Sequence, residues 1–137
     1  MQPGNDKVHT FRFPKAERIC SRTQIENLLQ KKQKVFCYPF KCFYAIQPAT
    51  ESAMQNQMLV SAPKRLFKHA VDRNRIKRLT REAYRLHHPS HLDSWTKAAG
   101  VRVQIIFHYV APEILPYNFI EDKIIEILHR LKEGLSE

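Results

Sequence analysis

An amphipathic segment in the third quarter of the chain constrains its fold most strongly. Between residues 72 and about 87, apolar side chains recur at steps of three and four, at Ile76, Leu79, Ala83 and Leu86, with Thr80 beside them. This spacing is typical of one face of an α-helix. Asp72 suits the N-cap position, and Pro89 stands where such a helix should stop. The pattern predicts a helix that packs one face against a core.

The opposite face of this predicted helix is cationic. From residue 64 to residue 85 there are nine Lys and Arg and only two acids, so this segment carries +7 of the chain's net charge of +10. Like charges at four-residue spacing disfavour a helix by about 0.2–0.5 kcal/mol per pair. Guanidinium groups match phosphate oxygens and release counterions when they bind them. The segment therefore predicts contact with RNA or DNA; the alternative is an idle solvated surface.

The remaining pattern predicts an α+β protein. Residues 1–15 show no period and are expected to form an extended N-terminal arm, followed by a single RNA-binding domain over residues 16–134. Within the domain we expect a short helix from Ser21 to about Lys32, strand structure at 35–46 interrupted by Pro39, a strand at 58–62, a half-buried strand at 101–109, and a helix from Asn118 that Gly134 ends.

Other features narrow the class of protein. The three cysteines show no CxxC spacing, which favours reduced thiols in the cytoplasm over a disulfide framework or a zinc ribbon. No segment approaches 18 uninterrupted apolar residues, so no contact with a membrane is expected. His87, His88 and His91 lie close in sequence, but no carboxylate or cysteine completes a metal-binding pattern. We expect neither a metal site nor a catalytic residue on this chain.

The stretch from Ala70 to Arg85, AVDRNRIKRLTREAYR, resembles the "RNR" signature helix of bacterial ribonuclease P protein subunits. The likeness extends over most of the chain, from Arg18-Ile19 to the strand at 101–110. The resemblance implies an α/β sandwich in one compact domain. A central, mostly antiparallel sheet of about four strands would combine with three helices in the order αββ(β)αβα. It also implies a left-handed βαβ crossover around the signature helix, against the usual rule.

The resemblance implies two RNA sites. The first is the surface for the catalytic RNA, formed by Lys64, Arg65, Lys68, Arg73, Asn74, Arg75, Lys77, Arg78, Arg81 and Arg85. The second is a cleft between the first helix and the sheet, which would hold the 5′ leader of precursor tRNA through Arg18, Ile25, Leu29, Phe40 and Phe43. Family members carry phenylalanines where this chain has Ile25 and Leu29, which leaves base stacking to Phe40 and Phe43; the alternative for these two is a place in the core.

The function that the resemblance implies is assistance to a catalytic RNA that removes the 5′ leader from precursor tRNA. Magnesium, held mainly by the RNA, would supply the chemistry, and the protein would bind and position the substrate as a monomer in a 1:1 ribonucleoprotein. Two alternatives remain. One is a general structural RNA-binding or ribosomal-type protein. The other is a small metal-independent nuclease that uses His69 or His108 as its acid or base.

Overall fold

The computed structural model describes residues 18–19, 22–30, 33–51 and 53–136; the predicted arm over residues 1–15 and the start of the first predicted helix lie outside them. The elements along the chain are α2 (Arg22–Gln30), β1 (Lys34–Cys37), β2 (Phe40–Pro48), β3 (Gln57–Ser61), α3 (Ala70–His88), the π-helical turn η2 (Pro89–Asp93), α4 (Ser94–Ala99), β4 (Val101–Tyr109) and α5 (Tyr117–Ser136).

The four strands form one mixed sheet in the order β1-β2-β4-β3. The pairs β1/β2 and β2/β4 are antiparallel, and β3/β4 is parallel. The mostly antiparallel sheet predicted from the sequence is therefore confirmed. Pro39 does not interrupt a single strand but lies in the turn of the β1–β2 hairpin, after a cis peptide bond from Tyr38.

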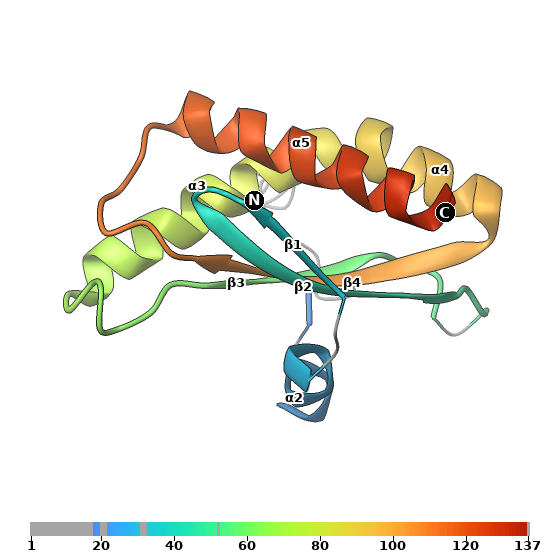
Figure 1. The fold of residues 1–137 in the computed structure, drawn as a ribbon, viewed down its shortest axis with the longest axis horizontal. Helices are drawn as coiled ribbons and strands as arrows, with labels where there is room; N and C mark the ends of the chain where they lie inside the picture. The colour runs from blue at the N-terminus through green and yellow to red at the C-terminus, as the bar shows by residue number, and fades with distance from the viewer. Residues whose placement is uncertain (1–17, 20–21, 31–32, 52, 137) are drawn as a thin grey trace, which may run out of the picture.

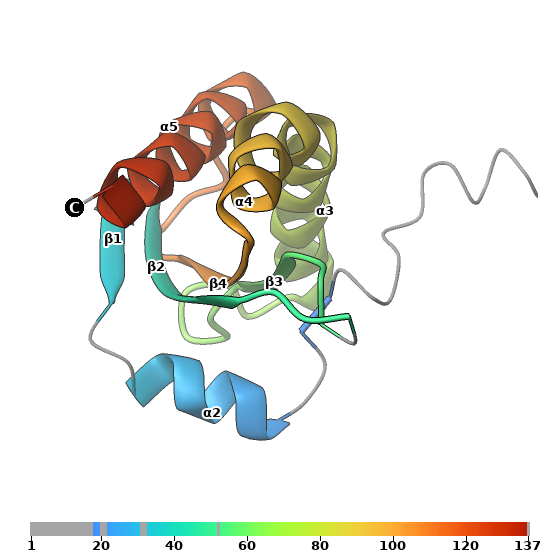
Figure 2. The ribbon, with the colours of Figure 1, turned by 90° about the vertical axis from the view of Figure 1, so that its right-hand side faces the viewer.

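The connection from β3 through α3 to β4 is left-handed, as the family resemblance implied. In the end-on view of Figure 2, β3 lies to the right of β4 and α3 lies above both strands. Figure 1 shows that both strands run away from that viewpoint and that α3 returns toward it. With the helix in front and the strands pointing up, the chain thus moves to the left, which is the rare hand for such a crossover.

The helices cover both faces of the sheet. α3, α4 and α5 pack on one face and α2 crosses the other (Figures 1 and 2). The larger core lies under α3 and α5 and includes Ile76, Tyr84, Phe107 and Ile124, each fully buried. A smaller core under α2 consists of Ile19, Leu28, Ala45 and Ile106, with Ile25, Phe43 and Leu59 packed against it. Both cores share the same sheet, so the described chain forms one domain.

The predicted signature helix is longer than its sequence pattern suggested. α3 begins two residues before Asp72, which lies in the first turn, where a carboxylate interacts well with the helix dipole. Pro89 does not end the helical path. It takes the first position of η2, where its missing N–H costs no hydrogen bond, and the chain continues into α4 until Gly100 adopts φ 68°. At the other end of the domain, Gly134 lies inside α5 and does not end it.

The buried face of α3 also differs from the prediction. Leu86 is 48% exposed, whereas Tyr84, which lay outside the predicted stripe, is fully buried, as is Thr80 beside that stripe. Tyr84 packs its ring edge-on against Phe107 at 6.0 Å between centroids. The Thr80 hydroxyl donates to the carbonyl of Ile76 at 2.8 Å, which lets a polar side chain sit in the core. The helix therefore turns a slightly different face to the sheet, centred between Ile76 and Tyr84.

Candidate RNA interface

The solvent face of α3 carries unneutralised positive charge. Asn74, Arg75, Arg78 and Arg81 are all exposed, on the side of the helix away from Ile76. Arg75, Arg78 and Arg81 form no ion pair with any residue that the structure describes. Within the described part of the chain, this row of guanidinium groups therefore has no counter-charge.

Two of the predicted RNA-contact residues also form contacts within the protein. Arg73 Nη1 donates to the carbonyl oxygens of Phe67 at 2.7 Å and Lys68 at 3.0 Å, so it ties the start of α3 to the preceding loop. Arg85 forms an ion pair with Glu82, one turn earlier on the same helix. These contacts give both arginines a structural role in addition to the predicted one. Lys77 is half-buried at the edge of the face.

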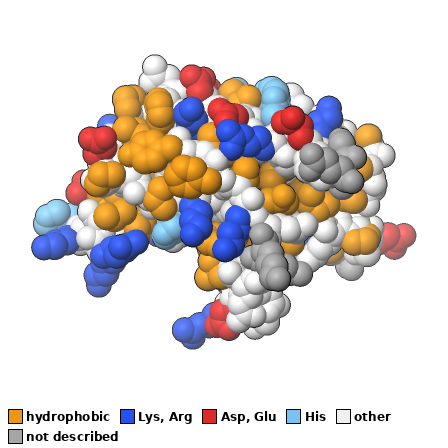
Figure 3. All heavy atoms as spheres, in the orientation of Figure 1, with side chains coloured by type: hydrophobic (Ala, Val, Ile, Leu, Met, Phe, Trp, Pro, Cys, Tyr) orange, Lys and Arg blue, Asp and Glu red, His pale blue; other side chains and the backbone are white. Residues whose placement is uncertain are grey.

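The loop between β3 and α3 extends this cationic surface. Lys64, Arg65 and Lys68 are exposed. The amides of Leu66 and Phe67 both donate to the carbonyl of Pro63, at 3.2 and 3.1 Å, which turns the chain sharply and presents the cations outward. Figure 3 shows Lys and Arg side chains gathered at this end of the molecule.

The β3–α3 loop also borders the α2 face of the sheet, near His108. Burial, followed by the charges of Arg65 and Lys41, lowers the pKa of His108 below its usual range. Its Nδ1 lies 3.1 Å from the Ser61 hydroxyl on β3. Cations of the loop and of β2 are therefore close enough to share one electrostatic environment on this side of the sheet.

Arg18 links the two predicted RNA sites. It forms a parallel bridge with Met58 at the outer edge of β3, and the amide of Ile19 donates to the carbonyl of Met58 at 3.1 Å. The pKa of Arg81 is lowered, first by partial burial and then by the charge of Arg18. Arg18 and Arg81 are therefore close to each other, at the edge of the sheet where its α2 side meets the exposed face of α3.

The predicted leader residues of α2 and β2 meet on this side of the sheet. Leu28 is buried against the sheet, Ile25 and Phe43 both pack against the smaller core, and Leu29 is 48% exposed. Phe43 is half-buried and flanked by cations: the Nζ atoms of Lys34 and Lys41 each lie 5.7 Å from its ring centroid. An aromatic ring between two lysines is suited to a base and its phosphates.

Phe40 does not belong to this surface, so its predicted place in the leader cleft is wrong. It is fully buried in the larger core, on the opposite face of the sheet, where its ring packs against Phe107 and Tyr109 with centroids 5.8 and 5.6 Å away. Side chains alternate along a strand, and Phe40 and Phe43 are three positions apart. Only one of the two could lie on the α2 face.

The histidines near the end of α3 interact with groups of the protein itself. His87 Nε2 lies 2.7 Å from Glu121 Oε2, and His91 Nδ1 lies 2.9 Å from His129 Nε2. Among the described residues, no group of three or more His, Cys, Asp or Glu is arranged to hold a metal ion. No helix in that part of the chain is long and apolar enough to cross a bilayer.

The sequence did not indicate one feature of the α2 face. A polar hollow lies on the side of α2 away from Phe43 and is lined in part by Asn27, Gln47, Arg102 and Gln104. The alternation along β4 places Arg102 and Gln104 on this face, but only the position of α2 turns them into a site.

Together, the mixed sheet and the exposed arginines of α3 define a basic α+β protein with a surface for a polyanion. The family model described as Ribonuclease P matches residues 13–132, and the chain belongs to this ribonuclease P protein family. A ribonuclease P protein component of Porphyromonas gingivalis is 32% identical over 123 residues, which cover 89% of this chain and 88% of that protein.

Solved structures share the fold. The RNase P protein of Staphylococcus aureus superposes with a TM-score of 0.63 at 23% identity, covering 86% of this chain and 97% of that one. The RNase P protein of Thermotoga maritima gives a TM-score of 0.59 at 16% identity, covering 83% and 96%. The predicted fold class is therefore confirmed.

Proposed function

We propose that this protein is the RNA-binding subunit of a tRNA-processing ribonucleoprotein endonuclease. It binds the catalytic RNA through the exposed face of α3 and the β3–α3 loop. It also holds the 5′ leader of precursor tRNA on the α2 side of the sheet. Membership of the ribonuclease P family supports the assignment.

The observation that carries the proposal is the set of exposed arginines on α3. Arg75, Arg78 and Arg81 point away from the core and have no carboxylate partner among the described residues. Repulsion within such a row costs stability in the free protein. Phosphates of a folded RNA would remove that repulsion and release their counterions in the process.

The leader site follows from the residues around α2. Arg18 supplies a cation beside α3, Ile25 and Leu29 supply an apolar flank, and Phe43 supplies a ring between two lysines. A single strand that leaves the catalytic RNA near Arg81 would reach Arg18 first and then Phe43. The protein thereby distinguishes precursor tRNA, which has a leader, from mature tRNA, which has none.

In this proposal the cleavage chemistry belongs to the RNA. Magnesium ions held mainly by the RNA would activate water and stabilise the leaving oxygen. The protein's own residues bind and orient the substrate, which lowers the entropic cost of reaching the reactive geometry. One protein would bind one RNA, in the cytoplasm.

Reconstitution with a bacterial ribonuclease P RNA at low magnesium tests the proposal. The protein should restore cleavage of precursor tRNA at the mature 5′ end, and it should bind precursor tRNA more tightly than mature tRNA in the presence of the RNA. Equal affinity for the two tRNAs would indicate a general RNA-binding protein instead. Cleavage by the protein without RNA, abolished by His69→Ala or His108→Ala, would indicate a nuclease.

A further inference from the structure

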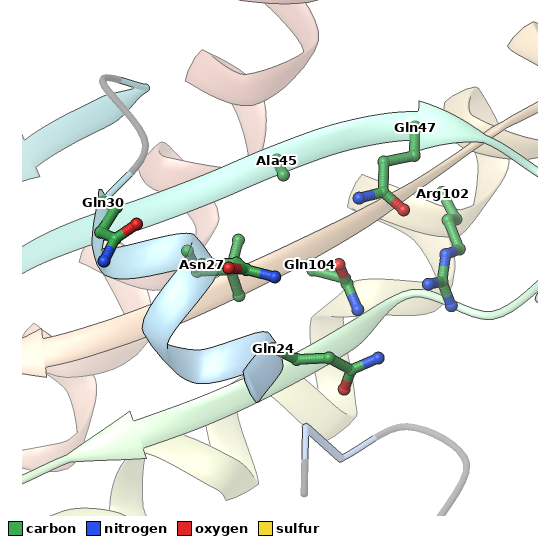
Figure 4. A pocket seen from close by; sticks show the side chains of 8 residues that line it. Gln24, Asn27, Gln30, Ala45, Gln47, Arg102 and Gln104 are labelled. Carbon is green, nitrogen blue, oxygen red and sulfur yellow. The ribbon is translucent and has the colours of Figure 1, made fainter. Parts of the chain in front are cut away.

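α2 divides the outer face of the sheet into two flanks. Leu28 faces the sheet, so helical geometry places Ile25 and Leu29 along one side of it and Gln24 and Asn27 along the other. The first flank adjoins Phe43 and is the leader site proposed above. The second contains a hollow of about 460 Å³ between α2 and strands β2 and β4 (Figure 4). The proposed function does not use this hollow.

Carboxamide side chains dominate the lining of the hollow. The residues that form it are Gln24, Asn27, Leu28, Gln30, Ala45, Gln47, Arg102 and Gln104. This set includes no carboxylate and no aromatic ring. Each Asn or Gln presents both a donor and an acceptor, which is the pattern that base edges require. The chemistry of the lining therefore suits hydrogen bonding to a base and offers no ring for stacking.

The strand register builds the floor of the hollow. Ala45 pairs with Gln104, and the next pair on the same face is Gln47 with Arg102. Residues two apart on a strand share a face, so three polar side chains surround the methyl group of Ala45. A larger side chain at that position would fill the space. The hollow thus results from a small residue among long polar ones.

Gln104 is held in one orientation. Its Nε2 donates to Gln57 Oε1 at 2.9 Å, and the residue is only 4% exposed. Its amide group is thereby engaged, while its Oε1 accepts no hydrogen bond from the described residues and lies in the lining of the hollow. The hollow therefore presents a fixed acceptor at its floor.

Arg102 supplies a positive charge at the edge of the same hollow. Its side chain is half-buried and forms no ion pair within the part of the chain that the structure describes. Figure 4 shows its guanidinium group beside Gln104 and Gln47. A guanidinium without an acidic partner, next to amides, is suited to a phosphate group.

We propose that this hollow, the amide cleft, binds one nucleotide of a single-stranded RNA, with its phosphate on Arg102 and its base edge on Asn27, Gln47 and Gln104. The volume lies within the range of pockets that hold small ligands. Adenine, cytosine and guanine carry an exocyclic amino group, whereas both exocyclic groups of uracil are acceptors. The one donor on the edge of uracil, N3–H, lies between two carbonyl acceptors, so the fixed acceptor of Gln104 pairs less favourably with uracil than with the amino groups of the other three bases.

Short 5′-phosphorylated trinucleotides of A, C and U, added to the full-length protein, test the base preference. The side-chain NH2 resonances of Asn27 and Gln47 should shift on binding, and they report this cleft separately from the Phe43 flank. The A and C strands should bind about 5- to 10-fold more tightly than the U strand, the difference expected from one hydrogen bond. Gln104→Leu should remove that difference.

Two further variants and one control complete the test. Arg102→Gln should weaken all three strands by a similar factor, because the phosphate contact is independent of the base. Asn27 lies on the exposed side of α2. The Asn27→Leu variant should therefore fold and lower affinity even if Gln104→Leu does not fold. Gln55→Leu removes an exposed amide outside the cleft and should change nothing. The proposal is overturned by unshifted Asn27 and Gln47 resonances, by an A-to-U ratio that a folded Gln104→Leu variant leaves unchanged, or by an unchanged affinity of Asn27→Leu.

A second experiment, with different RNAs, shows which RNA supplies the strand that binds in the cleft. If the leader occupies the cleft, Arg102→Gln weakens binding of the reconstituted complex only to precursor tRNAs whose leader exceeds a threshold length. If the catalytic RNA occupies it, the same variant weakens assembly with that RNA alone. Weakening of neither RNA overturns the site. Low-magnesium cleavage of precursor tRNA tests the proposed function independently of all three results.

Discussion

Replacing Arg78 by alanine should lower the salt dependence of binding to the catalytic RNA. Arg78 is the sharpest choice on α3, because its side chain is exposed and pairs with no carboxylate among the described residues. Each phosphate contact contributes about 0.7 to 0.9 to the steepness of log K against log salt concentration. The loss of one contact should therefore make the slope shallower by about that amount.

The size of the expected change in affinity depends on how many arginines of the exposed face of α3 are replaced. Between 50 and 200 mM salt, one contact corresponds to a change in affinity of about threefold. The binding defect of Arg78→Ala should therefore shrink by about threefold over this range. Arg75, Arg78 and Arg81 share the exposed face, so the triple alanine variant should show a slope shallower by about 2 to 3 and a defect that shrinks by about 20- to 40-fold.

Fluorescence anisotropy with labelled catalytic RNA at three or more salt concentrations measures these slopes. Lys97→Ala provides a matched control, since it removes one exposed positive charge from α4 and should leave the slope close to that of the parent protein. Circular dichroism confirms that each variant is folded. A triple variant whose slope equals that of the parent would exclude this face of α3 as the RNA surface.

Three other predictions follow from particular contacts. Phe40→Ala should lower the free energy of unfolding, measured in urea, by about 3–5 kcal/mol, because its ring is fully buried. Phe43→Ala should mainly weaken leader binding, by about 1–3 kcal/mol. The reverse result would contradict the assignment of Phe40 to the core and of Phe43 to the α2 face. Arg73→Ala should lower the unfolding free energy by about 1–3 kcal/mol, because two loop carbonyls lose their donor; unchanged stability would refute this role. Burial, followed by the neighbouring histidines, lowers the pKa of His91 below the usual 6.5. The unfolded chain therefore binds this proton more readily than the folded protein. The stability that depends on neutral His91 is complete above about pH 6.5 and should fall as the pH drops below it. His91→Gln should flatten that dependence, and an equally steep pH profile in this variant would contradict the reasoning.

The sequence by itself was sufficient for the fold class and for the cationic face of α3. Both depend on periodicity, and the 3.6-residue and two-residue repeats of helix and strand follow from local backbone geometry. The spacing around Ile76 alone predicts that Arg78 and Arg81 point away from the core, and both are exposed in the folded protein. The resemblance of the signature stretch added the left-handed crossover, which no periodicity could indicate.

Element ends and the precise buried face depended on tertiary contacts. Pro89 is a stop signal by its local chemistry, but the burial of Leu92 and Trp95 keeps the chain helical through η2 and α4. Leu86 has the more apolar side chain, yet Tyr84 takes the place in the core because the sheet meets α3 on that side. Propensity is a weak prior, and the packing of the whole domain overrides it.

The two flanks of α2 show most clearly what only the tertiary structure decided. The residue types along β2 and β4 fix which side chains share a face of a strand, but they do not fix what covers that face. The packing of Leu28 on Ala45 and Ile106 sets the position of α2. That position leaves Phe43 beside an apolar flank and encloses Gln104 and Arg102 in a polar hollow, because a site made of distant segments exists only once non-local packing brings those segments together.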